Sequence, residues 1–571
     1  MPNTHIAATA VPQDDLLASV FEERAEHLSP VELASWTTYT DKDEAVIQKL
    51  MGPGAKLLIG PRGSGKSTLL RTAYFRLQEG GDALGAYVNY AKSLALEPLF
   101  HKQANALQLF RHWLVMKIVL GVNESLRDAR RDIPDELGRM AGYARTLVQQ
   151  LENGVVPTSV EHFVAPSRLV ELLEEWTLAA GLRRCVLLLD DAAHAFSPEQ
   201  QREFFEVFRE LRSRRLSGKA AVYPGITSYS PNFHVGHEAE LLEAWYRPDA
   251  DDYLRSMRSL VEKRLPESLR QQLTERQDLV DYLALAAFGL PRGFLNMLSQ
   301  LFGIDEETAV RPTRNRAVDA VADHAESVRG LFRALSAKLP RFRFFVEVGK
   351  ELEAALTRTV RDYNRLQDKP SKKATVVAIE EPIGPELERM LNMLEYAGVI
   401  RRLGTVSRGV KGRFQRYAIH HAILVSENAL SLGRSFSLAN VVEALATKDA
   451  HAFTRTRDVV LLGPDYKKRC RLDLPPCVVC GTPRIAEDQH FCMRCGSELT
   501  NASVYEELLR ASITHLPLTQ RKLQGIVEHT AIRTIQDVLL DDEAQTLRRV
   551  PYIGPIWAAR IRTYAEEFVS V

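Results

Sequence analysis

The stretch AKLLIGPRGSGKSTLLRTAYFRL, residues 55–77, decides the fold of this chain. Its centre is Gly60-Pro61-Arg62-Gly63-Ser64-Gly65-Lys66-Ser67, a full match to the phosphate-binding loop pattern. An apolar run, Leu57–Ile59, precedes the loop, and a segment with helical periodicity, Thr68–Leu77, follows it. In that setting the glycines let backbone N–H groups converge on phosphate oxygens, and the helix adds the positive end of its dipole. We therefore predict that Gly60–Thr68 bind ATP, with Lys66 on the β- and γ-phosphates and the Ser67 hydroxyl on Mg²⁺.

A second run supplies the acidic partner of this loop. Four apolar residues, Val186–Leu189, are followed by Asp190 and Asp191. A buried strand that presents carboxylates at its carboxyl end is where a Mg²⁺-organising aspartate belongs in phosphoryl-transfer sites. We expect Asp190 to hold Mg²⁺ through water and Asp191 to orient the water that attacks ATP. The alternative for this run is a buried strand capped by solvated acids.

Four motifs, in chain order, resemble those of AAA+ and signal-transduction (STAND) P-loop ATPases, and most closely the bacterial group similar to origin-recognition and initiator ATPases. They are the phosphate-binding loop, the acidic run, AVYPGITSYS at 221–230, and Gly289-Leu290-Pro291-Arg292-Gly293-Phe294-Leu295. The resemblance covers roughly residues 26–310. It implies a polar sensor, Thr227 or Ser228, and a second sensor, Arg292, that reaches the γ-phosphate. A surface arginine at a helix start is the alternative for Arg292.

Two departures and one open assignment accompany that resemblance. The family usually has glutamate after the first aspartate, and Asp191 is one methylene shorter, so we expect slow hydrolysis. The interval from Lys66 to Asp190 is long, at 124 residues (190 − 66), which indicates helices inserted around residues 95–180. The family typically donates an arginine finger to a neighbouring subunit. Its candidates here are Arg212, Arg214 and Arg215, which equally fit a solvated helix end.

The whole chain is predicted to be a multidomain α/β protein. At 571 residues it is too long for one core. The candidate core strands are Lys56–Ile59, Gly85–Asn89, Cys185–Leu189 and Ala220–Thr227. The expected parts are a flexible tail (1–25), a P-loop AAA+ core with the helical insertion (26–235), a helical lid (236–310), a winged-helix-like domain (311–450), a zinc ribbon (470–500) and a small helical, helix-hairpin-helix-like domain (501–571).

A basic hairpin in the winged-helix-like domain is the candidate DNA contact. Glu386–Gly398 has the apolar spacing of a helix, and Val399–Leu403 and Tyr417–Ile419 are predicted strands. The segment 401–416 holds no acid and six basic residues: Arg401, Arg402, Arg408, Lys411, Arg413 and Arg416. Initiator-type ATPases carry a winged helix after the lid, and its wing would contact phosphates of double-stranded DNA. A solvated loop or a protein contact is the alternative.

Four of the six cysteines form a predicted zinc site. Cys477 and Cys480 make one Cys-x₂-Cys pair, and Cys492 and Cys495 make the other, with eleven residues between the pairs. Four thiolates complete a tetrahedral Zn²⁺ site with no open position, so the metal is expected to be structural. Thiolates that bind metal, in place of disulfides, also indicate a reducing compartment.

The last part of the chain resembles a helix-hairpin-helix unit, in which the backbone amides of a glycine turn bind a DNA phosphate. Tyr552–Pro555 would form the turn, with Arg560 and Arg562 nearby. Ile556 stands where the unit usually has a second glycine, and residues 501–571 hold 8 basic and 9 acidic residues. DNA contact and protein docking therefore both stay open for this region.

Composition constrains the partner only weakly. The net charge is +1, so any DNA-binding surface must be a local patch. The start of the sequence lacks the marks of a signal peptide and no membrane span is expected, which favours a cytoplasmic protein. The leading hypothesis is an ATPase that forms ADP and phosphate slowly and whose nucleotide state switches DNA binding or homo-oligomer assembly. The alternative is a signalling or scaffold ATPase, for example of a bacterial defence system, that recruits a separate effector protein without binding DNA.

Overall fold

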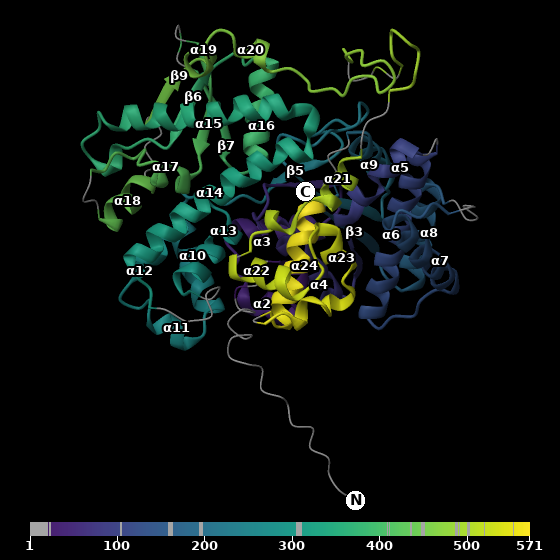
Figure 1. Cartoon of the computed structure of the whole chain (residues 1–571). Helices are drawn as coiled ribbons and strands as arrows, with labels where there is room; N and C mark the ends of the chain where they lie inside the picture. Colours follow the sequence, from purple (N-terminus) through teal and green to yellow (C-terminus); the bar gives the residue numbers. More distant parts are fainter. Residues whose placement is uncertain are drawn as a thin grey trace, which may run out of the picture.

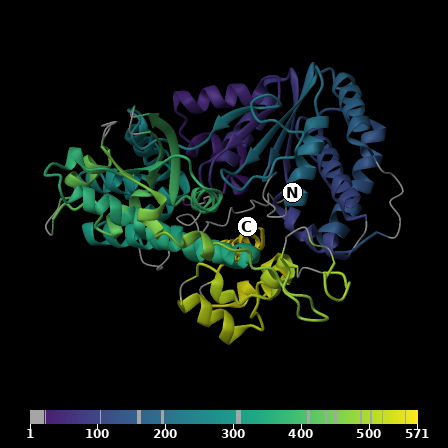
Figure 2. The same cartoon turned by 90° about the horizontal axis from the view of Figure 1, so that it is seen from above.

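The structure is a computed structural model of the chain. It describes Phe21, 24–102, 105–157, 164–192, 198–303, 311–407, Gly409, 412–433, 437–446, 452–485, Gln489, 491–499, 503–518, 520–551 and 553–570. In Figure 1 the N-terminal core and its inserted helices lie on one side, and the lid and winged region lie on the other. Figure 2, from above, shows the C-terminal helices (yellow) beside the junction of these two halves.

A parallel sheet forms the core. Within the described residues it has five strands, in the order β2-β3-β4-β1-β5. They are β1 (Lys56–Ile59), β2 (Ala83–Asn89), β3 (Arg184–Asp190), β4 (Leu216–Val222) and β5 (Glu240–Glu243). All neighbouring strands are parallel. The carboxyl ends of β1, β4 and β3 therefore meet at one edge, which is where ligands bind in open α/β sheets.

Helices cover both faces of this sheet because its strands are apolar on both sides. Leu187 and Leu189 of β3 point into one apolar cluster, and Val186 and Leu188 point into another. The first cluster includes the long helix α6, and the second includes α3 and α4. The helices of this region are η1 (Ala25–His27), α2 (Pro30–Trp36), α3 (Asp41–Met51), α4 (Lys66–Gly80), η2 (Ala91–Leu96), α5 (Glu97–Lys102), α6 (Ala106–Asp128), α7 (Asp135–Glu152), α8 (Pro166–Ala179) and α9 (Pro198–Glu210).

Three sequence-based boundaries in the core need correction. The expected strand Ala220–Thr227 ends at Val222, because Pro224 and Gly225 (φ 77°) begin a turn. β5 pairs with β1, so the core continues beyond residue 235 to at least Glu243. The expected tail, 1–25, lies mostly outside the described residues, but Phe21 is only 2% exposed and packs into the core.

The lid and the winged region follow β5. The lid helices are α10 (Tyr253–Arg264), α11 (Glu267–Gln271), α12 (Gln277–Ala286) and α13 (Pro291–Leu301). The next helices are α14 (Arg314–Lys338), η4 (Pro340–Phe342), α15 (Arg343–Asn364), η5 (Pro370–Lys372), α16 (Pro385–Tyr396), α17 (His421–Ser426), α18 (Leu438–Leu445), α19 (Asp458–Leu462) and α20 (Tyr466–Arg469). The strands are β6 (Val376–Glu380), β7 (Ile400–Ser407), β8 (Arg413–Ile419) and β9 (Phe453–Thr456), in the order β7-β8-β6-β9.

The predicted hairpin after α16 is confirmed, because β7 and β8 pair antiparallel. The winged region is longer than expected. β9 pairs with β6 although it lies beyond residue 450, and Cys470 Sγ is buried 3.9 Å from the sulfur of Met390 in α16. This region therefore extends to about residue 470.

The C-terminal region returns to the core. Its helices are α21 (Val504–Arg510), η7 (Ile513–His515), α22 (Gln520–His529), α23 (Ile535–Leu540), η8 (Asp542–Ala544), η9 (Leu547–Arg549) and α24 (Pro555–Ser570). The start of α21 docks on the insertion, where Glu97 of α5 accepts hydrogen bonds from Ser503 Oγ (2.6 Å) and Val504 N (3.4 Å). α24 packs on η2, next to the end of β2. The segment immediately before the predicted glycine turn is the three-residue η9. The helix-hairpin-helix pattern would have a full helix at that position.

Candidate nucleotide site

A cavity of about 910 Å³ opens at the carboxyl edge of the sheet. Ligand pockets in proteins are commonly about 300–1,000 Å³, so it is large enough for a nucleotide. Of the residues predicted from sequence, those that line it are Arg62, Gly63, Ser64, Gly65, Lys66, Ser67, Thr68, Asp191 and Arg292. Three predicted residues lie behind the residues that line the cavity. The carbonyl oxygens of Gly60 and Pro61 accept hydrogen bonds from Lys66, and the Asp190 carboxylate is hydrogen-bonded by Ser67. The loop, one of the two acids and the lid arginine thus meet at one cavity.

The phosphate-binding loop has the geometry that the glycine pattern predicts. Gly63 (φ 77°) and Gly65 (φ 93°) are in the left-handed region, which side chains other than glycine rarely adopt. Lys66 is 6% exposed and its Nζ donates to the carbonyl oxygens of Gly60 (2.7 Å) and Pro61 (3.1 Å). The Ser64 hydroxyl is buried and has no hydrogen-bond partner among the described residues. A phosphate would satisfy that hydroxyl and give the Lys66 ammonium a charged partner, so the loop fits a nucleotide.

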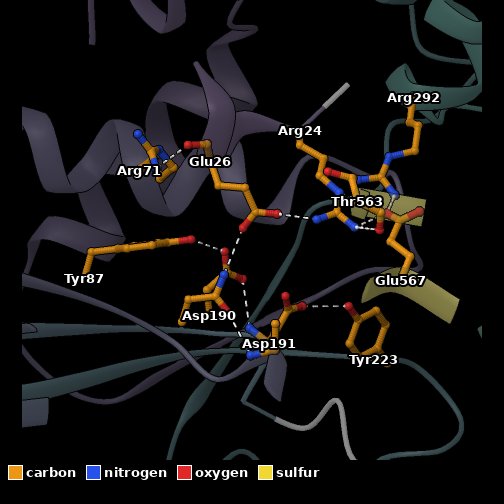
Figure 3. Close-up of polar contacts among 12 residues, drawn as sticks. Arg24, Glu26, Arg71, Tyr87, Asp190, Asp191, Tyr223, Arg292, Thr563 and Glu567 are labelled. Atoms are coloured by element: carbon orange, nitrogen blue, oxygen red, sulfur yellow. Dashed lines mark hydrogen bonds and ion pairs between the residues drawn. The ribbon is translucent and has the colours of Figure 1, made fainter. Parts of the chain in front are cut away.

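Asp190 is completely buried beneath the loop. Its Oδ2 accepts a hydrogen bond from the Tyr87 hydroxyl at 2.7 Å, as Figure 3 shows, and the Ser67 hydroxyl also hydrogen-bonds this carboxylate. Burial raises the pKa of Asp190, and the charge of Asp191 raises it further. Burial lowers the pKa of Lys66. Both shifts disfavour the charged forms, and a bound Mg²⁺–phosphate group would reverse them. Ser67 and Asp190 therefore fit the magnesium site that the sequence predicts.

Asp191 faces the cavity in a strained backbone. Its φ is 50°, in the left-handed region that is uncommon for residues other than glycine. The Tyr223 hydroxyl donates a 2.9 Å hydrogen bond to Asp191 Oδ1, and Lys66 Nζ lies 3.9 Å from the centre of the same tyrosine ring. Tyr223 therefore touches the two groups that would face the γ-phosphate and the attacking water.

Tyr223, and not Thr227, lines the cavity at the end of β4. The Thr227 hydroxyl donates to the Tyr223 carbonyl at 2.7 Å and accepts from the Tyr223 amide at 3.2 Å, so it closes the turn after the strand. Ser228, the other sensor candidate, donates its backbone N–H to Gln201 Oε1 at 2.6 Å. Sequence reasoning missed Tyr223 because the strand was expected to continue to Thr227. The Pro224-Gly225 pair was the available turn signal.

Arg292 begins the lid helix α13 and lies against the loop. Its backbone N–H points to the Gly63 carbonyl at 3.4 Å, and a Cβ at Gly63 would come within 2.8 Å of the Arg292 Cβ. Its Nη1 lies 3.2 Å from Glu567 of α24. The structure thus brings the predicted second sensor to the phosphate-binding loop, in contact with a C-terminal carboxylate that sequence reasoning did not find.

Further lining residues come from segments without a motif. The N-terminal segment contributes Arg24, Glu26 and 37–39, and the lid contributes Met257 and Leu260. The apolar lid residues and Tyr39 are suited to cover a base. No spacing pattern in the sequence marks these residues as ligand contacts.

The basic hairpin is only partly available to a nucleic acid. Arg401 is 5% exposed and binds the Tyr246 carbonyl (2.6 Å) and Glu243 (2.5 Å), so it joins the winged region to the core. Arg402 donates to Glu388 at 2.6 Å and to Asn392 at 2.9 Å. Both side chains hold the fold together, which corrects their assignment to a DNA-contacting wing.

Of the remaining four basic residues of the hairpin, the structure describes two. Arg413 is exposed and lies 3.1 Å from Glu381, and Arg416 Nε donates to the Gly404 carbonyl at 3.0 Å. Arg408 and Lys411 lie outside the described residues. Any electrostatic wing contact therefore depends on the hairpin tip and Arg413.

The other arginine candidates are also placed. Arg212, Arg214 and Arg215 are exposed before β4, at the edge of the sheet opposite the cavity, and Arg212 pairs with Glu238. Arg560 Nη2 points to the Phe21 carbonyl at 3.5 Å, and Arg562 Nη1 donates to the Asp541 carbonyl at 3.0 Å. Both of these last two side chains contact the protein itself, and Arg562 also lines the nucleotide cavity. Tyr552 of that turn lies outside the described residues.

The four clustered cysteines converge as predicted. The Sγ atoms of Cys477, Cys480, Cys492 and Cys495 all lie within 4.8 Å of one another. Two of these separations, Cys477–Cys495 and Cys480–Cys492, are 3.5 Å. Tetrahedral Zn–S bonds of about 2.3 Å place sulfurs roughly 3.8 Å apart, so the cluster fits one Zn²⁺ with four protein ligands.

Among the helices that the structure describes, none is long and apolar enough to cross a membrane.

Comparisons with known proteins agree with the first motif. Residues 19–90, which include the phosphate-binding loop, match the family model described as ORC-CDC6-like. The resemblance to origin-recognition and initiator-like AAA+ ATPases is thereby confirmed for this part of the chain. A search of curated protein sequences gives no match.

Two solved structures are similar over most of their length. One is the Orc1 protein of Aeropyrum pernix in complex with DNA. It is 18% identical in sequence, the match covers 69% of this chain and 94% of that chain, and the TM-score is 0.30. The other is Cdc6p from Pyrobaculum aerophilum, at 14% identity, 74% and 97% coverage and a TM-score of 0.31. At such TM-scores these likenesses carry no conclusion about function. The α/β fold class is confirmed by the parallel core sheet itself.

Proposed function

We propose that this chain is an ATPase of the AAA+ type that binds ATP and Mg²⁺, hydrolyses ATP slowly, and changes its engagement of double-stranded DNA with nucleotide state. One observation carries the proposal: Lys66, Asp191 and Arg292, from three separate parts of the chain, line one cavity of about 910 Å³. A phosphate-binding lysine, an acid for water and a lid arginine are the parts that phosphoryl transfer needs.

Each residue has a role that its position supports. The loop amides, the Ser64 hydroxyl and Lys66 would bind the phosphates, and Arg292 would reach the terminal one. Ser67 and Asp190 would hold Mg²⁺, which when bound neutralises charge on the β- and γ-phosphates. Asp191 would accept a hydrogen bond from the attacking water. Its Oδ1 accepts a hydrogen bond from the Tyr223 hydroxyl at 2.9 Å, which lowers the basicity of the carboxylate towards that water and supports slow hydrolysis.

The nucleotide site also touches the winged region. The Tyr223 ring lies 5.6 Å from the ring of Tyr396 in α16, and a Cβ at Gly225 would collide with the backbone of Asn392 in the same helix. The turn after β4 therefore joins the residue beside Lys66 to the helix that precedes the basic hairpin. A shift of Tyr223 on ATP binding would move α16, and this supports a nucleotide-dependent switch of the hairpin.

A second candidate function is favoured by the zinc region. Val478 and Val479 in the first cysteine pair are 85% and 73% exposed, and Met493 in the second pair is 77% exposed. Exposed apolar side chains on a metal-stiffened loop suit a protein partner better than a phosphate backbone. A signalling or scaffold ATPase that recruits an effector protein is thus the alternative to DNA engagement.

The test is steady-state ATP hydrolysis with and without duplex DNA, with Lys66→Ala as the control. We expect a low rate that depends on Lys66 and rises severalfold with DNA. Reversing charge at Arg408, Lys411 and Arg413 should abolish the DNA effect, whereas Arg365→Glu, at an exposed position after α15, should not. An ATP hydrolysis rate that depends on Lys66 but does not change when DNA is added would refute the DNA role and favour the signalling function. A rate unaffected by Lys66→Ala would refute the ATPase site.

A further inference from the structure

The C-terminal helix α24 brings one carboxylate to the nucleotide cavity. Glu567 Oε1 lies 2.8 Å from Arg24 Nη2 and 3.2 Å from Arg292 Nη1. Figure 3 shows both arginines turned towards this carboxylate, with Thr563, one helical turn earlier, beside Arg24. Arg62 of the phosphate-binding loop is a third positive charge that acts on Glu567. One acid of α24 thus binds Arg24 of the N-terminal segment and Arg292 of the lid, and it interacts electrostatically with Arg62 of the loop.

This cluster carries more positive than negative charge. Besides Glu567, the acid next to it is Glu26, 3.5 Å from Arg24, so the three arginines face two carboxylates. Although burial alone would raise the pKa of Glu567, the three arginines lower it to about 2, so the carboxylate is charged at neutral pH. A surplus of cations around one bound anion suits a ligand with more negative charge than a carboxylate.

All three arginines line the nucleotide cavity, and two of them adjoin the phosphate-binding loop. Arg62 is part of the loop, and the Arg292 backbone lies 3.4 Å from the Gly63 carbonyl. Phosphates bound over Gly63–Ser67 would therefore end near the guanidinium groups that Glu567 now occupies. ADP ends one phosphate earlier than ATP.

We propose that Glu567 competes with the γ-phosphate of ATP for Arg62 and Arg292, so that it discriminates ATP from ADP and couples ATP binding to the release of α24. This inference rests on the proposed nucleotide site. ADP binds with α24 in place, because it carries no third phosphate. ATP binds when Glu567 leaves, since two anions cannot both occupy the same partly desolvated arginines without strong repulsion.

Release would extend beyond the single ion pair. α24 packs on η2 and α23, and the N-terminus of α21 is held by Glu97 of the insertion. Loss of the Glu567 contacts removes the ion pairs of α24 with Arg24 and Arg292, and leaves its packing on η2 and the attachment of α21 to Glu97. ATP binding would therefore loosen the end of α24 from the lid while α21 stays attached to the insertion, so that the amides of α24 open to solvent more often.

The first experiment compares ATP and ADP binding by calorimetry, with the full chain and Mg²⁺, for the wild type and Glu567→Gln. Hydrogen bonds between charged groups are worth at least about a factor of ten, so ATP affinity should rise at least about tenfold in the variant. ADP affinity should change by less than about threefold, because ADP does not compete. Glu528→Gln is the matched control, since Glu528 is an exposed glutamate of α22 in the same C-terminal region and is not among the residues that line the cavity. It should change neither affinity.

A second measurement needs no variant. Hydrogen exchange of the amides of 555–570 should stay slow in the wild type without nucleotide and with ADP, and become faster with a non-hydrolysable ATP analogue. If the wild type binds neither nucleotide, the nucleotide site itself is refuted. If it binds ATP but Glu567→Gln binds ATP equally or more weakly, competition is refuted. Exchange in α24 that slows with the ATP analogue would also refute it, and would mean that α24 closes over the nucleotide.

Discussion

Gly63→Ala tests the contact between the phosphate-binding loop and the lid. Gly63 has φ 77°, and a Cβ there would lie 2.8 Å from Cβ and 3.4 Å from Cδ of Arg292. Holding alanine in the left-handed region costs about 1–2 kcal/mol. The Arg292 Cβ is fixed to its backbone, so the start of α13 or the loop itself must also move. If about 2 kcal/mol falls on the binding-competent conformation, ATP affinity falls about 30-fold.

Calorimetric titration with ATP and Mg²⁺ measures this change. Gly81→Ala is the matched control, because Gly81 has φ 68° at the end of α4 and no atom within 4 Å of its added Cβ. That variant should lose about 1 kcal/mol of stability from backbone strain, seen as a lower melting temperature, and keep its ATP affinity. The reasoning is wrong if Gly63→Ala binds ATP as tightly as Gly81→Ala. In that case neither the left-handed loop nor the close approach of Arg292 would matter for binding.

Three further changes test other parts of the structure. Mg²⁺ affinity should rise with pH through neutrality, because the raised pKa of Asp190 makes Mg²⁺ compete with a proton. Titrations of Mg²⁺ at several pH values should show this slope in the wild type and a flatter one in Asp190→Asn. Cys480→Ser should lower bound zinc, measured by elemental analysis, from one ion per chain, with ATP affinity unchanged; unchanged zinc would contradict the four-cysteine site. Arg401→Gln removes a buried guanidinium that binds the Tyr246 carbonyl and the half-exposed Glu243, and should lower stability by about 1–2 kcal/mol in thermal melts. Arg413→Gln, at an exposed position of the hairpin, should leave stability unchanged. An equal loss of stability in both variants would contradict the role of Arg401 in joining the winged region to the core.

The sequence predicts those parts of the site whose residues are close together in the chain. The loop Gly60–Ser67 and the pair Asp190–Asp191 each form within one strand end, so spacing and residue type are enough to recognise them. The cysteine pairs are recognisable for the same reason, since Cys-x₂-Cys presents two thiolates to one metal. In each of these cases local geometry follows from local sequence.

The rest depends on contacts that no local pattern encodes. Glu567 meets Arg292 across 275 positions, and an acid in a helix of mixed charge looks like any solvated side chain. Tyr223 was missed because a proline and a glycine end β4 before the polar residues that looked like the sensor. The basic hairpin shows the same limit. Arg401 and Arg413 are alike in sequence, yet one is buried in an ion pair and the other is exposed.

The cysteine cluster shortens the connection between the winged region and the C-terminal helices. Cys477 and Cys495 are 18 positions apart, a length that could extend to about 60 Å, yet their Sγ atoms lie 3.5 Å apart. Closing this loop shortens the tether between Cys470, which is buried in the winged region, and Ser503 at the start of α21. A shorter tether raises the local concentration of the start of α21 near Glu97, the contact that stays in place when α24 is released. Zinc would therefore stabilise the anchor of the C-terminal helices on the insertion, and a chain without zinc would lose that anchor more often.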